Sequence, residues 1–263
     1  MVCALTIAGS DSGGGAGIQA DLRTFSAHGV HGLSAIAALT AQNTRRVTAI
    51  HVPPVEFLRA QIDACFADFQ IGAVKIGMLA NAAVVHAVAD ALEHYRPRYI
   101  VLDPVMIATS GTRLLEPDAL DALRARLLPL ASIVTPNAQE AELLLGRPVD
   151  GAAAAETALD GLLALAANAV LLKGGHLPGG DTVTDRYADR DIRTAFVHAR
   201  LNVNARGTGC TLAAAIAANA CHGCTLLKAC EAATDYVHGA LLNSYLPAQS
   251  KVAVLDHFWR NNK

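Results

Sequence analysis

Five consecutive residues, Gly207-Thr208-Gly209-Cys210-Thr211, place two glycines, two hydroxyls and a thiol directly before an alanine-rich run. The alanines predict a helix that begins at once, so several free backbone N–H groups and the positive end of the helix dipole should face one point. Such a point binds anions, above all phosphate. In the first turn the thiolate of Cys210 would be stabilised. The segment predicts transfer of a phosphoryl group, although a glycine turn before a core helix with a small buried cysteine fits it equally well.

A second glycine-rich stretch, residues 9–17, lies between an apolar run at 2–8 and a helical pattern at 18–28. A strand, a glycine loop and a helix in this order are typical of nucleotide-binding folds. A dinucleotide-binding dehydrogenase would need an acidic residue at the end of its second strand. The expected second strand, residues 33–40, is followed by Ala41-Gln42-Asn43-Thr44, which disfavours a dehydrogenase. The sequence also lacks the Gly-Lys-Ser/Thr element of a Walker P-loop.

The rest of the chain alternates short apolar runs with amphipathic ones. This alternation predicts one α/β domain over residues 1–263, with a mainly parallel central sheet flanked by helices on both faces. Two shorter strands between 182 and 199 should form an antiparallel edge. The other expected strands are 47–52, 73–76, 99–102, 132–135 and 169–173, and the other expected helices are 54–69, 81–95, 117–128, 137–145, 152–168 and 226–246.

Polar side chains follow most of the expected strands. Ligands of such sheets bind beyond the C-terminal ends of the strands, so we expect these side chains to form one site. Several have a purely structural alternative: Asn137 and Glu140 can form a capping box, and Asp103 before a proline can start a turn. The candidates are Asp11, Ser12, Gln42, Asn43, residues 75–78, Asp103, Asn137, Glu140 and Lys173.

Composition limits the class of protein. Hydrophobic residues make up 52% of the 263 residues and charged residues 17%, with a net charge of −2 and no basic run, which argues against nucleic acid as the principal partner. We expect neither a signal peptide nor a membrane span. The six cysteines are scattered, which predicts reduced thiols in a cytoplasm. The pair Cys221 and Cys224 has no second pair to complete a zinc site, and Gly223 between them is expected to end a helix.

Seven motifs, which appear in the order typical of one family and cover nearly the whole chain, identify a resemblance. The chain resembles the hydroxymethylpyrimidine and phosphomethylpyrimidine kinases of thiamine biosynthesis, within the ribokinase superfamily. The motifs are AGSDSGGGAGIQAD (8–21), AQNT (41–44), KIGML (75–79), VLDPVM (101–106), TPNAQEA (135–141), LKGGH (172–176) and GTGCT (207–211).

The resemblance implies a ribokinase-like kinase that uses ATP and Mg²⁺. It would phosphorylate 4-amino-5-hydroxymethyl-2-methylpyrimidine, and then the monophosphate to the diphosphate. The amide of Gln42 could accept from the amino group of the pyrimidine and donate to its ring nitrogen. Met78 and Val105 would form apolar walls for the ring. Ala16 would also bind the substrate, and Asp21 would contact its polar edge.

The resemblance also assigns the phosphate end of the site. Asp103 and Glu140 would hold magnesium through water, with Asn137, and Lys173 would contact the nucleotide phosphates as a point charge. The amides of Gly207, Thr208, Gly209 and Cys210 would cradle the transferring phosphoryl group, Thr208 would also bind the nucleotide, and the side chain of Cys210 would take the hydroxyl proton.

Three segments depart from the family pattern: Arg206 replaces a histidine, Thr109 stands where the family often has lysine, and the tail 247–258 is divergent. A pyridoxal kinase of the same subfamily remains an alternative, as does a ligand-binding protein without catalysis. By resemblance we expect a homodimer.

Overall fold

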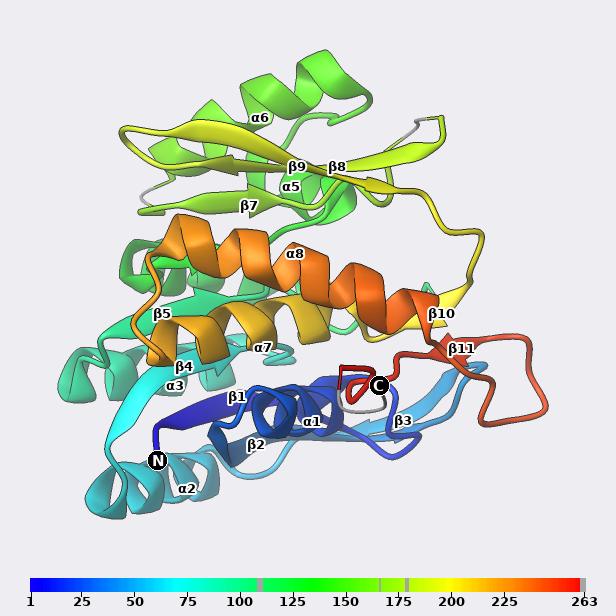
Figure 1. Cartoon of the computed structure of the whole chain (residues 1–263). Helices are drawn as coiled ribbons and strands as arrows, with labels where there is room; N and C mark the ends of the chain where they lie inside the picture. Colours follow the sequence, from blue (N-terminus) through cyan, green and yellow to red (C-terminus); the bar gives the residue numbers. More distant parts are fainter. Residues whose placement is uncertain (108–110, 166, 178–179, 261–263) are drawn as a thin grey trace.

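The computed structural model describes residues 1–107, 111–165, 167–177 and 180–260. In this part of the chain, nine strands form one sheet in the order β3-β2-β1-β4-β5-β6-β7-β8-β9 (Figure 1). The six strands from β2 to β7 are parallel, whereas β3, β8 and β9 are antiparallel to their neighbours. The mainly parallel sheet and its antiparallel edge are therefore confirmed. The bounds are β1 Cys3–Asp11, β2 His31–Gln42, β3 Val47–His51, β4 Ile71–Ile76, β5 Tyr99–Leu102, β6 Ile133–Val134, β7 Val170–Leu172, β8 Thr182–Ala188 and β9 Arg193–Ala199.

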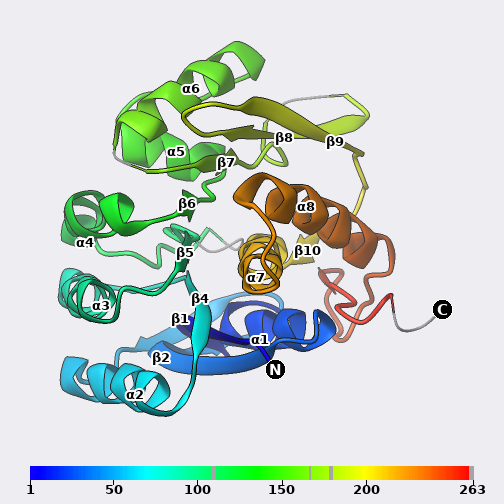
Figure 2. The ribbon, with the colours of Figure 1, turned by 60° about the vertical axis from the view of Figure 1, so that its left-hand side comes forward.

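Helices cover both faces of the sheet, as expected (Figure 2). Each face has its own hydrophobic core, and the strands between them are buried on both sides, which explains their continuous apolar runs. One face carries α2 Val55–Asp68, α3 Ala82–Tyr95, α4 Pro117–Ala122, α5 Ala138–Leu145 and α6 Ala152–Ala164. The other carries α1 Gly17–Ala27, α7 Thr208–Cys221 and α8 Leu226–Leu242.

Helix α7 is the central helix of its face, between α1, α8 and the sheet (Figure 2). Its residues from Thr211 to Ala218 are all buried, and most of them are alanines. Small side chains let the helix lie close to β4 and β5. The N-terminus of α7 is therefore held at the edge of the sheet where those strands end.

Four expected boundaries were wrong, for identifiable reasons. β1 continues to Asp11 because a bulge at Gly9 keeps it paired with β2. The helix expected at 117–128 is regular only to Ala122 and then widens into a π-helical turn and a 3₁₀ turn, since Pro129 cannot donate a hydrogen bond. α6 ends at Ala164, before the chain turns toward β7. α8 ends at Leu242 because Tyr245 pairs with Val254 instead.

The C-terminal tail forms a feature that the sequence did not predict. Residues Ala253–Val254 (β11) pair in parallel with Ala205–Arg206 (β10), directly before Gly207. His257 is buried, and its Nε2 lies 3.1 Å from Oγ1 of Thr211 in α7. The tail thus supports the segment that leads into the predicted anion site.

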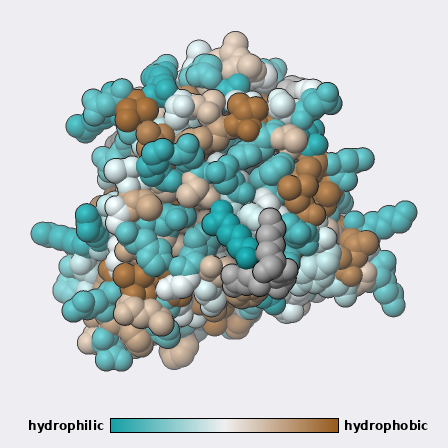
Figure 3. All heavy atoms as spheres, viewed as in Figure 1, coloured by the Kyte–Doolittle hydropathy of each residue, from teal (hydrophilic) through white to brown (hydrophobic). Residues whose placement is uncertain are grey.

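The surface seen in Figure 3 mixes hydrophilic residues with small separate groups of hydrophobic ones, so this face has no broad apolar surface. None of the described helices is long and apolar enough to cross a bilayer. The six cysteines are free thiols. Gly223 adopts the left-handed conformation just after the end of α7, as expected for a helix C-cap.

Candidate active site

A cavity of about 660 Å³ lies at the C-terminal ends of the parallel strands and at the N-terminus of α7. The predicted polar edge is therefore confirmed as a location: of the assigned site residues, all except Asp21 line the cavity. They are Ala16, Gln42, Met78, Val105, Asp103, Asn137, Glu140, Lys173 and residues 207–210.

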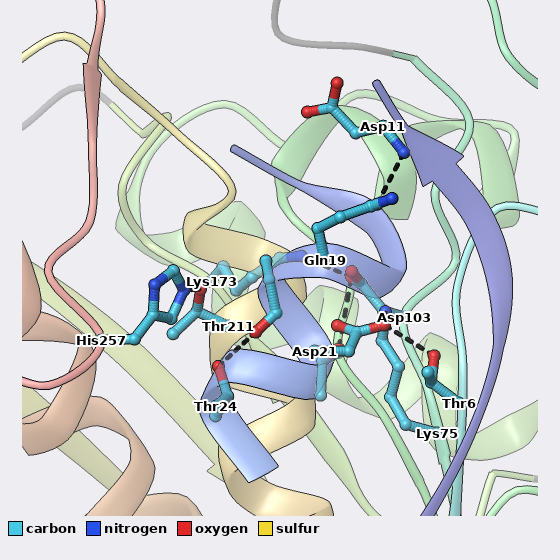
Figure 4. A network of polar contacts seen from close by, with 12 residues as sticks. Thr6, Asp11, Gln19, Asp21, Thr24, Lys75, Asp103, Lys173, Thr211 and His257 are labelled. Atoms are coloured by element: carbon cyan, nitrogen blue, oxygen red, sulfur yellow. Dashed lines mark hydrogen bonds and ion pairs between the residues drawn. The ribbon is translucent and has the colours of Figure 1, made fainter. Parts of the chain in front are cut away.

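The glycine-rich loop after β1 is folded around the carboxylate of Asp11. Its Oδ1 accepts from the N–H of Gly13 at 2.8 Å, and its Oδ2 accepts from Gly15 and Ala16 at 3.1 and 2.9 Å. In Figure 4, the main chain of Asp11 also donates to Gln19. Three backbone donors of the loop are thus used within the protein. This loop is not built as a phosphate cradle, which is a second argument against a dinucleotide-binding site.

One end of the cavity has the walls expected for a flat ring. Met78 is buried and Val105 is half-buried, and Ala16 begins the turn into α1. Gln42 is the last residue of β2, and its main chain exchanges two hydrogen bonds of 2.8 Å with the hydroxyl of Ser12. This pairing fixes the backbone of Gln42 while its side chain belongs to the cavity lining.

Asp21 does not contact the cavity, contrary to the expectation that it touches the substrate. Its side chain is fully buried on the sheet-facing side of α1. Oδ2 accepts from Thr6 Oγ1 at 2.6 Å and pairs with Lys75 Nζ at 2.9 Å (Figure 4). Helical spacing from Ile18 and Phe25 was the signal that could have placed Asp21 on the buried face.

The segment before α7 has the geometry of an anion site. Gly207 is left-handed, with φ of 82°, and a Cβ there would lie 2.0 Å from the carbonyl oxygen of Gly15. Only glycine fits such a position. Gly209, by contrast, already belongs to the helix and has no positive φ. A Cβ at Gly209 would instead lie 3.1 Å from Nζ of Lys173.

Cys210 lies in the first turn of α7, as expected, but its thiol is not acidified. Burial raises the pKa of Cys210 to about 11, although the nearby Lys75 and a backbone hydrogen bond from Gly17 act in the opposite direction. The helix N-terminus therefore does not outweigh the loss of water around the sulfur. At neutral pH only a small fraction of Cys210 is therefore thiolate, and that thiolate is a strong base.

Three charged side chains meet beside Gly209. Nζ of Lys173 lies 2.9 Å from Oδ1 of Asp103 and 3.6 Å from Oε2 of Glu140. Burial alone would lower the pKa of Lys173, but the two carboxylates outweigh it and raise the pKa, so this lysine is a permanent cation. Burial raises the pKa of Glu140 to about 7, against the attraction of Lys173.

Glu140 and Asn137 have two functions in the structure. They form the capping box of α5: Oε2 of Glu140 accepts from the N–H of Asn137 at 2.8 Å, and Oδ1 of Asn137 accepts from the N–H of Glu140 at 2.9 Å. Both also line the cavity. The structural interpretation of this pair is thus correct, and it does not exclude the functional one.

Magnesium fits the side chains at this point. The described residues contain no cluster of three or more His, Cys, Asp or Glu that would form a cage for a metal ion. Mg²⁺ in kinases is usually bound by one or two carboxylates, by water and by the substrate phosphates rather than by such a cage. Asp103 and Glu140 supply two buried carboxylates, both within ion-pair distance of Lys173.

The cavity continues into a second part between β8, β9 and α8, which sequence reasoning missed. Its lining includes Asp185, His198 and His238. The imidazole rings of His198 and His238 stack with centroids 5.0 Å apart. These two histidines are forty residues apart in the sequence, so no local motif connected them.

One of the departures from the family pattern, Arg206, lies in the wall of the cavity. It is buried and donates through Nη1 to the carbonyl oxygen of Asn43. It therefore fixes the β2–β3 connection beside Gln42. Thr109 lies outside the described residues.

Comparison with known proteins gives one consistent result. The family model described as phosphomethylpyrimidine kinase matches residues 11–254. A hydroxymethylpyrimidine/phosphomethylpyrimidine kinase of Rhizobium meliloti is 51% identical over 240 residues, which are 90% of each chain. A crystal structure of phosphomethylpyrimidine kinase from Clostridium difficile has a TM-score of 0.81 and 40% identity, and covers 90% of this chain and 98% of its own. Pyridoxal kinase from Staphylococcus aureus, solved in complex with AMP-PCP and pyridoxal, has a TM-score of 0.91 but 29% identity, with 99% and 95% covered.

Proposed function

The chain belongs to the phosphomethylpyrimidine kinase family, and we propose which residues of its cavity bind the acceptor, transfer the phosphoryl group and bind ATP. The enzyme phosphorylates hydroxymethylpyrimidine and its monophosphate in thiamine biosynthesis. The pyridoxal kinases share the fold at lower sequence identity. The observation that carries our proposal is the position of the α7 N-terminus, which faces one cavity together with Gln42, Asp103 and Lys173.

The ring of the acceptor lies between Met78 and Val105, with its amino edge against Gln42. Both walls are apolar, and the main chain of Gln42 is fixed by Ser12. The side-chain amide of Gln42 can satisfy one donor and one acceptor of an aminopyrimidine at once. The hydroxymethyl group then points toward the N-terminus of α7.

The phosphoryl group is transferred at residues 207–210. The thiolate of Cys210 accepts the proton of the hydroxymethyl oxygen, this oxygen forms a bond to the γ-phosphorus, and the bond from that phosphorus to ADP breaks. The N–H groups at the start of α7 and the ammonium of Lys173 stabilise the charge on the phosphoryl oxygens. The thiol formed at Cys210 returns its proton to solvent before the next turnover.

Magnesium, held by Asp103 and Glu140, would neutralise charge on the polyphosphate of ATP. With its two carboxylate partners holding the metal ion, Lys173 would be available to bind phosphate oxygens. The nucleoside of ATP lies in the second part of the cavity, near the stacked rings of His198 and His238. A homodimer is proposed from the family resemblance, and a single domain over the whole chain from the alternation of strands and helices.

The assay compares three acceptors with Mg-ATP: the pyrimidine alcohol, its monophosphate and pyridoxal. We expect kcat/KM to be highest for the two pyrimidines. A preference for pyridoxal would contradict the assignment of Gln42 and Met78 to pyrimidine recognition.

The same assay tests Cys210. Cys210→Ala should lower kcat by a factor of about 10²–10⁴ and leave the affinity for nucleotide near that of the parent, because the backbone cradle remains. Cys65→Ala, on α2 at the other face of the sheet, is the control and should behave like the parent. Normal turnover of Cys210→Ala would refute the base and leave catalysis to the cradle.

A further inference from the structure

Lys75 is a buried lysine to which the proposed mechanism gives no role. It lies in β4, in the middle of an apolar run, and its side chain has no solvent exposure. The residue nevertheless lines the cavity. A lysine is almost never fully buried without a charged partner, and here the partner is Asp21 at 2.9 Å.

The surroundings are shaped to hold this ammonium group in one place. A Cβ at Gly77 would lie 2.8 Å from Nζ of Lys75, so the glycine leaves the space that the ammonium needs. On the other side, Oδ2 of Asp21 is held by Thr6 at 2.6 Å (Figure 4). Burial alone would lower the pKa of Lys75, but the negative charges of Asp21, Cys210 and Asp103 raise it, so the lysine stays protonated.

Cys210 is the neighbour on which this charge acts. Four charged groups interact with its thiol: Lys75 from β4, Lys173 after β7, Asp21 from α1, and Asp103 after β5. Both lysines favour the thiolate and both carboxylates oppose it, and the effect of Lys75 is the largest of the four. The pair of Lys75 and Asp21 therefore favours the thiolate as a whole, because the effect of Lys75 exceeds that of Asp21.

We propose that Lys75 is a positioning residue for catalysis: its buried ammonium, anchored by Asp21, stabilises the thiolate of Cys210 while it accepts the substrate proton. This rests on Cys210 as the base. In this proposal Lys75 acts through the sulfur rather than by binding the acceptor ring or the phosphates. Lys173, which lies beside Gly209, is assigned to the phosphoryl group instead.

The test measures the thiol itself. The rate of iodoacetamide alkylation of Cys210 is followed between pH 7 and 11 by peptide mass spectrometry, in the protein without nucleotide. Because burial raises the parental pKa of Cys210 to about 11, the rate should rise with pH throughout this range. Lys75→Met should raise that pKa by about one unit or more, so that alkylation is roughly tenfold slower at each pH from 7 to 10. Lys75→Arg keeps the charge and should stay near the parent. Cys224, beyond the C-terminal end of α7, is the internal control in every sample.

A double variant separates Lys75 from its partner. In Lys75→Met/Asp21→Asn neither charge is present, so the alkylation rate at a given pH should lie between those of the parent and Lys75→Met. The double variant also removes the unpaired carboxylate, which keeps the test valid if Lys75→Met does not fold. An alkylation rate in the double variant equal to or above the parental rate would overturn the proposal. The exposed Lys228→Met serves as the control for loss of a lysine.

Measurements of kcat and KM test the role of Lys75 separately from the role of Cys210 as the base. If Lys75 acts through Cys210, Lys75→Met lowers kcat, moves the pH profile of kcat upward together with the alkylation profile, and leaves KM for the pyrimidine unchanged. A changed KM with an unchanged alkylation profile would mean that Lys75 contacts the substrate, and would refute the proposal. If alkylation shifts while the pH profile of kcat does not, Cys210 is not the base, and the role of Lys75 in catalysis fails with it.

Discussion

Replacing Glu140 by glutamine should make the protein more stable at alkaline pH, although it removes an ion pair. Burial raises the pKa of Glu140 to about 7 from its ordinary value of 4.5. Between these two pH values the folded protein keeps a proton on Glu140 that the unfolded chain has released. The folded state binds more protons, so the free energy of unfolding falls as pH rises through this interval.

The magnitude follows from the width of the interval. One pKa unit corresponds to about 1.4 kcal/mol, so the ionisation of Glu140 costs the folded state roughly 3 kcal/mol above pH 7. The cost is absent below pH 4.5, where Glu140 is protonated in both states. Glutamine cannot ionise, and its side-chain oxygen can still accept from the N–H of Asn137 in the capping box.

Urea denaturation in EDTA, without nucleotide, measures this difference. The free energy of unfolding of Glu140→Gln minus that of the parent should increase by roughly 2–3 kcal/mol between pH 5 and pH 8. Glu142→Gln, on the same helix, is the matched control. A difference between variant and parent that stays constant within about 0.5 kcal/mol over this range would refute the reasoning, because Glu140 would then titrate as in water.

Three further predictions concern the other parts of the site. Gln42→Ala should raise KM for the pyrimidine alcohol by about ten- to a hundredfold through loss of a buried hydrogen-bonded pair, and unchanged kinetics would remove Gln42 from the site. Gly207→Ala should abolish nucleotide binding measured by calorimetry, since its Cβ would overlap the carbonyl of Gly15, whereas Gly180→Ala, with open space around it, should bind as the parent does. Because burial raises the pKa of Cys210 to about 11, kcat should increase with pH from 7 to 10; a flat profile would show that deprotonation of this thiol does not limit turnover.

Most of the architecture could be predicted because the parallel strands are buried on both faces and leave continuous apolar runs. The same geometry explains why the site location was predictable. Parallel strands end at one edge of a sheet, so polar residues directly after them must meet there. Gln42, Asp103 and Lys173 were found in this way, from positions that are far apart in the sequence.

The errors arise where tertiary packing decides the outcome. Asp21 was assigned to the substrate from resemblance, whereas α1 turns it onto the sheet and Lys75 binds it. The acidity expected for Cys210 followed from the helix N-terminus alone and neglected burial. The two-residue strands β10 and β11 are too short to leave a period in the sequence, and His198 and His238 meet only through the packing of α8 on β9.

The N-terminus of α7 can act as a fixed catalytic element because the chain before it is held from two sides. The main chain of Gly207 lies against the carbonyl of Gly15, and Ala205–Arg206 pair with the tail at Ala253–Val254. The tail continues to His257, which is buried against Thr211 in the same helix. A transferring phosphoryl group gains little from donors that must first be ordered, and much from donors already in place. In the proposed mechanism the divergent tail therefore supports catalysis indirectly, by keeping the backbone donors before α7 in one position.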